Sequence, residues 1–194
     1  MELLKLKVDH DEIIFIDESG FSLSMRRKLG RSARGARANL NVRSIRSKNV
    51  TLIAAMSSKK LWTFRVEHGC VNSHVFKTFI SDLFHDLRRE NVDKALLIMD
   101  NVPFHKTSEI RESVAEVGHT LLFLPPYSPF LNPIENLFHQ WKTIVRLSNP
   151  KDEMELDRCM VEATTKITTE QLKNYCRHSK TYQTRCLQRE PIEN

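Results

Sequence analysis

Several features are missing from this chain of 194 residues, and each absence argues against a class of protein or a kind of site. The four cysteines show no CxxC pairing, which argues against a zinc site or a disulfide framework and favours a reducing, intracellular setting. No apolar run approaches 18 residues, so the sequence predicts no membrane span. The GxxxxGK[ST] phosphate loop and the GxSxG nucleophile elbow are both absent. What remains is a chain long enough for one substantial domain.

Acidic residues are missing from residues 25–48, a segment that holds nine Lys and Arg side chains. The whole chain has a net charge of +6, so the remainder carries a small negative charge. This concentration of positive charge predicts contact with the phosphate backbone of a polyanion. A solvated loop or a nuclear-targeting signal is the alternative. The candidate contacts are Arg26, Arg27, Lys28, Arg31, Arg34 and Arg37.

Hydrophobic periodicity predicts alternating strands and helices. Short apolar runs predict strands at 12–17, 50–57, 61–67, 95–99 and 120–124, and three-and-four spacing predicts helices at about 76–87, 106–117 and 133–145. Gly20 indicates a turn after the first strand, and Asn72 or Ser73 is expected to cap the first helix. The order predicts an α/β fold with a mixed sheet flanked by helices over residues 1–150.

Residues 151–194 are polar, and we expect a helical C-terminal extension of the same domain. Its apolar side chains are the candidates for packing against the rest: Met154, Met160, Val161, Ile167, Leu172 and Tyr175. Between the last predicted strand and the helix that begins near Pro133 lies the segment PPYSPFLNP. Its four prolines exclude helix and sheet, so a rigid connector is expected.

Three acids stand where strands end or a helix begins. Asp17 and Asp100 each follow an apolar, strand-like run, and Glu135 opens a helix, with 34 residues between it and Asp100. Each has an ordinary structural explanation. The two aspartates suit turns, and Asn132 with Glu135 matches a capping box in which Asn132 is the helix cap.

Taken together, the three acids predict a metal site. Carboxylates are the oxygen ligands that Mg²⁺ prefers, and the dipole at a helix N-terminus favours the ionised form of Glu135. A pair of Mg²⁺ or Mn²⁺ ions about 4 Å apart can activate an attacking oxygen and stabilise the leaving one, which is the chemistry of cutting and joining phosphodiesters. We therefore interpret Asp17, Asp100 and Glu135 as catalytic, metal-binding residues of a DNA-processing enzyme.

Other polar residues flank these acids. Asn101, His105 and Asn132 are expected to orient the metal-binding carboxylates by hydrogen bonds without binding the metal themselves. His105 has a second interpretation, slightly favoured here, as a residue at a helix start whose ring is satisfied by hydrogen bonds. Tyr127 in the connector is a candidate for stacking on DNA, although packing is the more common use of such a residue.

Several motifs resemble one known family. FIDESGF, LLIMDNVPFHK and LFLPPYSPFLNPIENLFHQWK, together with GRSARGARA and VNSHVFKTFI, are similar to the signature blocks of the catalytic domain of mariner-superfamily DDE transposases. The resemblance covers about residues 12–146, with the blocks in the family's order and with its 34-residue gap between the second and third acids. It implies a ribonuclease H-like fold, with Asp17, Asp100 and Glu135 as the metal-binding triad.

The resemblance also implies an activity and partners. Members cut DNA at the inverted repeats of a transposon and join the freed 3′ hydroxyl to target DNA, usually at TA. No covalent enzyme intermediate is needed, because water and then the DNA hydroxyl attack at the same metals. The expected partners are double-stranded DNA and a second copy of the chain. Action on DNA implies the nucleus in a eukaryote or the cytoplasm in a bacterium.

Two departures from the family pattern stand out. Relatives carry an N-terminal helix-turn-helix region that reads the inverted repeats, whereas this chain begins almost at the first catalytic strand, as expected for a fragment or for a split or decayed element. Phe130 occupies a position where members often have an acid. The rival hypothesis is therefore a domesticated or decayed DNA-binding protein without activity. A purely structural α/β module would leave the basic segment unexplained.

Overall fold

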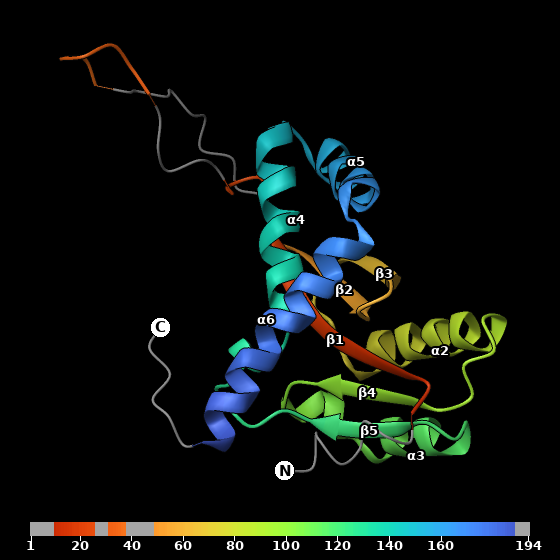
Figure 1. Ribbon diagram of the computed structural model, residues 1–194. Coiled ribbons are helices and arrows are strands. Elements are labelled where there is room, and N and C mark those ends of the chain that lie inside the picture. Colours follow the sequence, from red (N-terminus) through yellow and green to blue (C-terminus); the bar gives the residue numbers. More distant parts are fainter. Residues whose placement is uncertain (1–9, 26–30, 38–48, 189–194) are drawn as a thin grey trace.

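The computed structural model describes residues 10–25, 31–37 and 49–188. A five-stranded mixed sheet lies at its centre, with strand order β3-β2-β1-β4-β5 (Figure 1). β1 pairs antiparallel with β2 and parallel with β4, while β2 and β3 form an antiparallel pair and β4 and β5 a parallel one. The strands are β1 (Glu12–Phe21), β2 (Val50–Met56), β3 (Leu61–His68), β4 (Ala95–Met99) and β5 (Thr120–Phe123).

Helices cover both faces of this sheet. One face packs against α2 (Ser73–Arg89) and α3 (Ser108–Glu116), and the other against α4 (Ile134–Ser148), α5 (Glu153–Ala163) and α6 (Thr169–Leu187). Figure 1 shows α4 and α6 together on one side of the strands. Successive strand residues point to opposite faces, so Phe15 joins the core under α4 and Ile16 the core under α2. The predicted α/β architecture is confirmed.

The first strand is longer than predicted. β1 continues to Phe21, because its antiparallel partner β2 runs alongside it, pairing Asp17 with Ala54 and Gly20 with Thr51. The prediction that the strand ends at Asp17, followed by a turn at Gly20, was therefore wrong. The parallel pairing with β4 does stop here, since Ile16 opposite Met99 is the last pair. A single sequence does not show that the two sides of one strand end at different residues.

Local structure confirms the predicted cap of α2 and shows a tight turn between β2 and β3. The side chain of Asn72 accepts a hydrogen bond from the Val75 amide and caps α2, as predicted. The turn between β2 and β3 is closed by the amide of Ser57, which donates to the carbonyl of Lys60 at 2.9 Å.

The connector and the helices beside it differ from prediction. α4 begins at Ile134 with Pro133 as its cap residue and no side-chain cap, so Asn132 does not form the predicted capping box. The connector contains a short 3₁₀ turn, η3 (Pro129–Leu131), where no helix was expected, because proline is compatible with a first helical turn. The polar helix predicted at about 106–117 is confirmed as α3, and a short 3₁₀ turn, η2 (Pro103–Lys106), precedes it.

Between Pro150 and Gln188 the chain is mainly helical and packs on α4. Met160 and Leu172 are buried, and Ile167 and Tyr175 are partly buried against the same core. The indole nitrogen of Trp141 on α4 donates to the carbonyl of Met160 at 2.8 Å. Met154 and Val161 were wrongly expected to pack, since both are exposed on the outer side of α5. Among the described helices, none is both long and apolar enough to cross a membrane.

Candidate active site

Strand pairing places two of the three acids side by side at one edge of the sheet. Asp17 and Asp100 each come one residue after the last parallel pair, Ile16 and Met99. β4 ends at Met99, so Asp100 is the first residue beyond the strand. Asp17 is the first residue of β1 that has no partner on the β4 side. Residues that are 83 positions apart in the chain thereby become neighbours.

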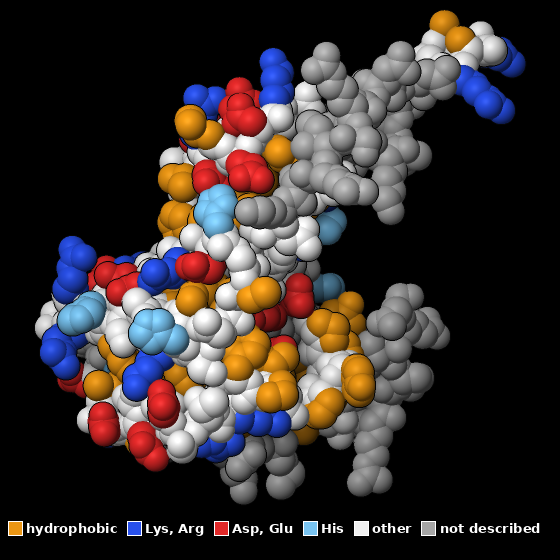
Figure 2. Space-filling view, turned by 180° about the vertical axis from the view of Figure 1, so that it is seen from behind, with side chains coloured by type: hydrophobic (Ala, Val, Ile, Leu, Met, Phe, Trp, Pro, Cys, Tyr) orange, Lys and Arg blue, Asp and Glu red, His pale blue; other side chains and the backbone are white. Residues whose placement is uncertain are grey.

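The third acid reaches the same place from a helix. Glu135 is in the first turn of α4, which packs against β1 through Ile134 and Leu137. Asp17, Asp100 and Glu135 all line one pocket of about 640 Å³. Acidic side chains lie beside hydrophobic ones in a hollow on the face shown in Figure 2. The three sequence-predicted acids therefore converge on one pocket.

Asp17 is held rigidly by two hydrogen bonds. Its Oδ1 accepts from the backbone N–H of Glu18 at 2.8 Å, and its Oδ2 accepts from Nδ2 of Asn132 at 2.9 Å. Asn132 is 2% exposed, and its own Oδ1 has no hydrogen-bond partner among the described residues. Asn132 thus positions Asp17, as its predicted supporting role implies, instead of capping α4.

Two of the acids hold their protons more tightly than usual. Burial raises the pKa of Asp17 to about 8, with smaller contributions from the nearby charges of Glu18, Glu135 and Asp100. Burial also raises the pKa of Glu135; Lys142 opposes this shift and the charge of Asp100 adds to it. The cause is the same in both cases, because several carboxylates share a poorly solvated space.

His105 joins two acids on the other side of the site. It is fully buried, and its Nδ1 donates to Asp100 Oδ1 at 2.8 Å while its Nε2 donates to Glu18 Oε1 at 2.9 Å. Burial by itself lowers the pKa of His105, but the hydrogen bonds and charges of the two acids raise it to about 9. The ring is therefore an imidazolium at neutral pH, with both nitrogens as donors. The ring of His105 is thus satisfied by hydrogen bonds, one of which fixes Asp100.

Glu18 is the site residue that sequence reasoning missed. The first strand was predicted to end at Asp17, which left Glu18 outside it. Because β1 continues, Asp17 and Glu18 point to opposite faces of the sheet. Asp17 faces the α4 side and meets Asn132, while Glu18 faces the α2 side and meets His105. The available signal was the strand pattern of residues 12–21, which continues past Asp17 to the apolar residue Phe21.

The remaining predicted residues are placed less centrally. Asn101 lines the pocket, without a hydrogen bond to the three acids among the interactions of the described residues. Tyr127 lines it too, but its side chain is 99% exposed, so the expectation that it packs was wrong. Arg31, Arg34 and Arg37 are exposed, and Arg26, Arg27 and Lys28 lie outside the described residues.

The donor set of the pocket fits hard divalent cations. Three carboxylates and the unpartnered Oδ1 of Asn132 offer only oxygen atoms, the ligands that Mg²⁺ and Mn²⁺ select. The raised pKa values of Asp17 and Glu135 indicate excess negative charge that a cation would offset. Within the described part of the chain, however, no three His, Cys, Asp or Glu side chains are already grouped closely enough to hold an ion.

A mixed sheet of this order, flanked by helices, with one acid inside its first strand and another directly after its fourth, is a ribonuclease H-like fold. The chain belongs to the DDE superfamily endonucleases, whose family description matches residues 12–157. The predicted fold and the predicted DDE family are thereby confirmed.

Solved structures of Mos1 transposase share this fold. The Mos1 paired-end complex with the left transposon end matches with a TM-score of 0.80 and 18% identity, over 97% of this chain and 58% of that one. The Mos1 strand transfer complex gives 0.81 and 18%, over 99% and 59%. The catalytic domain of Mos1 mariner transposase gives 0.75 and 15%, over 99% and 89%.

The chain thus spans about 60% of the length of the Mos1 chains in the DNA complexes and most of the isolated Mos1 catalytic domain. A comparison with curated proteins by sequence finds no match.

Proposed function

We propose that this chain is the catalytic part of a transposase, which cuts DNA at transposon ends and joins the freed ends to target DNA in a divalent-metal-dependent reaction. One observation carries the proposal. In a DDE superfamily endonuclease, three acids from distant parts of the chain line a single pocket at the end of the central strands.

Asp17, Asp100 and Glu135 would hold the metal ions, two in the proposed site. When bound, such ions activate the attacking oxygen and stabilise the charge on the leaving oxygen. The protein contributes by holding the ligands in place. Asn132 and the Glu18 amide orient Asp17, and His105 orients Asp100. Paired-end complexes of Mos1 have been solved with Mn and with Mg, which supports the choice of ions.

Double-stranded DNA and a second copy of the chain are the proposed partners. The Mos1 relatives include paired-end and strand transfer complexes, which supports a DNA substrate. The exposed guanidinium groups of Arg31, Arg34 and Arg37 are proposed to contact phosphates and thereby to add affinity that does not depend on DNA sequence.

The test is cleavage of supercoiled plasmid DNA with Mg²⁺ or Mn²⁺. Wild-type protein should nick or linearise the plasmid only when a divalent metal is present. Asp100→Asn and Glu135→Gln should each lower the rate by about 100-fold or more, because each removes a ligand charge at the reacting phosphate. Glu112→Gln is the matched control, since Glu112 is an exposed acid on α3. It should leave the rate unchanged.

Two results would count against the proposal in different ways. Equal cleavage by wild type and Asp100→Asn would show that the site is wrongly assigned. DNA binding without cleavage under all metal conditions would favour the domesticated DNA-binding protein.

A further inference from the structure

Tyr127 stands at the mouth of the acid pocket with its ring in solvent. Its side chain is 99% exposed, yet it lines the same pocket as Asp17, Asp100 and Glu135. Tyrosine usually buries most of its ring and leaves only the hydroxyl wet. A fully exposed aromatic ring beside a cluster of acids contributes almost nothing to the folded state, so packing does not explain it.

The backbone of Tyr127 makes this position costly for tyrosine. Its φ of 56° lies in the left-handed region, where a residue other than glycine or asparagine loses roughly 1–2 kcal/mol. Glycine or asparagine at this position would relieve the strain without any loss of packing. A bulky ring is therefore kept here at the expense of stability, as is typical of residues that bind a ligand.

The frame that holds the ring is rigid. Pro125 and Pro126 precede Tyr127, and the hydroxyl of Ser128 donates to the carbonyl of Pro126 at 3.2 Å across it. The next turn of the connector is fixed to α6, because Ser179 Oγ donates to the carbonyl of Leu131 at 2.8 Å.

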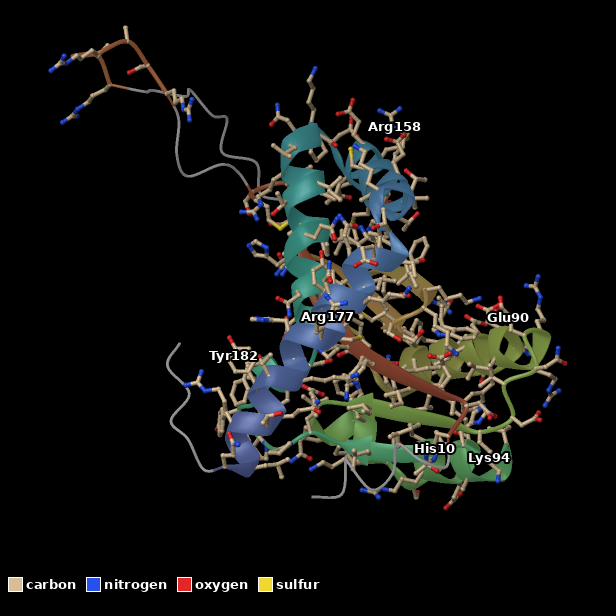
Figure 3. All side chains as sticks on the ribbon, viewed as in Figure 1. His10, Glu90, Lys94, Arg158, Arg177 and Tyr182 are labelled. Atoms are coloured by element: carbon tan, nitrogen blue, oxygen red, sulfur yellow. The ribbon has the colours of Figure 1, made fainter. Side chains whose placement is uncertain are left out.

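An aromatic contact strengthens the same attachment. The rings of Phe130 and Tyr182 are 5.6 Å apart between centroids, and Figure 3 shows Tyr182 on the C-terminal half of α6. Phe130, which replaces an acid frequent in the family, thus takes part in holding the connector. The connector that carries Tyr127 is therefore attached to α6 by a hydrogen bond and by an aromatic contact.

We propose that Tyr127 stacks on an unpaired nucleobase of the DNA strand whose phosphate enters the acid pocket, and so positions that phosphate. This inference rests on the proposed function. Every base has a π face, and stacking on an aromatic side chain contributes about 1–3 kcal/mol per base. Tyr127 lines the same pocket as Asp17, Asp100 and Glu135, so its ring is proposed to meet the base of a nucleotide whose phosphate lies among these acids.

A protein partner suits the position less well. Stable protein interfaces bury about 1,200 Å² or more, and the exposed ring here adjoins prolines and acids instead of an extended apolar surface. The other large exposed apolar side chains, including Met154 and Val161, lie on other elements.

The experiment compares binding of two short DNA duplexes by the full chain. One duplex is blunt and the other has a 3′ single-stranded overhang that carries 2-aminopurine. All proteins carry Asp100→Asn so that the probe stays intact. The protein without a change at Tyr127 should bind the overhang about tenfold more tightly than the blunt duplex and quench the 2-aminopurine. Tyr127→Phe keeps the ring and should behave in the same way.

Tyr127→Asn removes the ring and keeps a residue that tolerates the left-handed backbone. It should lose both the preference and the quenching, bind blunt DNA as before, and show an unchanged or higher thermal midpoint. A preference that survives in Tyr127→Asn would overturn the proposal. Loss of the preference in Tyr127→Phe would overturn it as well, because the hydroxyl and not the ring would then make the contact.

A change in self-association on sedimentation, with DNA binding intact, would show that Tyr127 contacts protein. Failure of the proposed function would look different. The plasmid assay would then give no metal-dependent cleavage, whereas the overhang preference and its dependence on the ring would be unaffected.

Discussion

His105 shares its two ring nitrogens between acids that come from different strands. The ring contacts both Phe76 and Phe104, with centroid distances of 4.2 and 4.4 Å, so it is fixed by packing as well as by hydrogen bonds. Its positive charge is retained because Glu18 and Asp100 offset the cost of burial. A single side chain thereby connects β1 to the end of β4.

Replacing His105 with glutamine should weaken both the fold and the site. The glutamine amide is neutral and has both N–H groups on one nitrogen, so it does not replace an imidazolium that donates from two separate nitrogens. At least one carboxylate then loses its partner in a poorly solvated place. The expected loss is about 1–3 kcal/mol in the free energy of unfolding, together with slower plasmid cleavage. Thermal unfolding followed by circular dichroism measures the first effect. His85→Gln on the exposed side of α2 is the control. Equal midpoints for the two variants would contradict the structural role.

At the scale of elements, α6 reaches back across the chain to the connector that precedes Glu135. Ser179 is buried, and its hydroxyl satisfies the carbonyl of Leu131, the residue before Asn132. Since Asn132 holds Asp17, α6 supports β1 at Asp17 through two hydrogen bonds. This arrangement explains how a helix distant in sequence from the acids can influence their positions.

Ser179→Ala should therefore reduce cleavage more than it reduces DNA affinity. The lost hydrogen bond leaves the Leu131 carbonyl without its partner, at an expected cost of about 1–3 kcal/mol in stability. Thr184→Ala, an exposed hydroxyl on the same helix, is the matched control. Cleavage rates at saturating DNA separate the two effects. A variant that loses affinity while its saturated rate stays at the wild-type value would show that α6 does not position the acids.

For the whole molecule, buried titratable groups set the pH dependence of stability. The pKa of Asp17 rises from 3.8 to about 8 on folding, so between these values the folded state binds a proton that the unfolded state has released. The pKa of His105 rises from 6.5 to about 9, and its contribution is present below pH 6.5 and lost as pH passes 9. Both shifts make the metal-free protein less stable as pH rises. His119, whose pKa burial lowers, acts in the opposite direction below pH 6.5.

We expect the thermal midpoint of metal-free protein to fall between pH 6 and 9, and Mg²⁺ to restore it most at the alkaline end. Cations compete with protons for the same carboxylates, and a ligand at about 100 times its dissociation constant adds roughly 2.7 kcal/mol. For a chain of this size, that is on the order of 5–10 °C.

Asp17→Asn tests the assignment of both effects. The Asn132 amide can turn over to accept a hydrogen bond from the new side chain, so the fold should tolerate the change. The free energy of unfolding should fall less between pH 6 and 9 than in wild type, by roughly 2 kcal/mol or more. The thermal midpoint should therefore depend less on pH, and the Mg²⁺ effect should disappear. A Mg²⁺ response equal to that of wild type would place the ion elsewhere in the molecule.

Much of this was predictable from local patterns. Apolar runs indicated all five strands, and the face formed by Phe76, Phe79, Ile80, Leu83 and Leu87 indicated α2. The three acids were recognised by their positions next to these elements. Predictions were wrong where two interpretations shared one local pattern, as for Asn132, which resembles a helix cap in sequence but forms a hydrogen bond with Asp17, 115 residues away.

The sequence by itself determined which acids are present, which elements carry them and which family they indicate, because these are properties of short segments. Only the tertiary structure decided that β1 runs past Asp17, that Glu18 faces His105, and that the ring of Tyr127 stands in solvent beside the pocket. The physical reason is that strand pairing and burial depend on partners far away in the chain, and no local pattern records which partner a side chain meets.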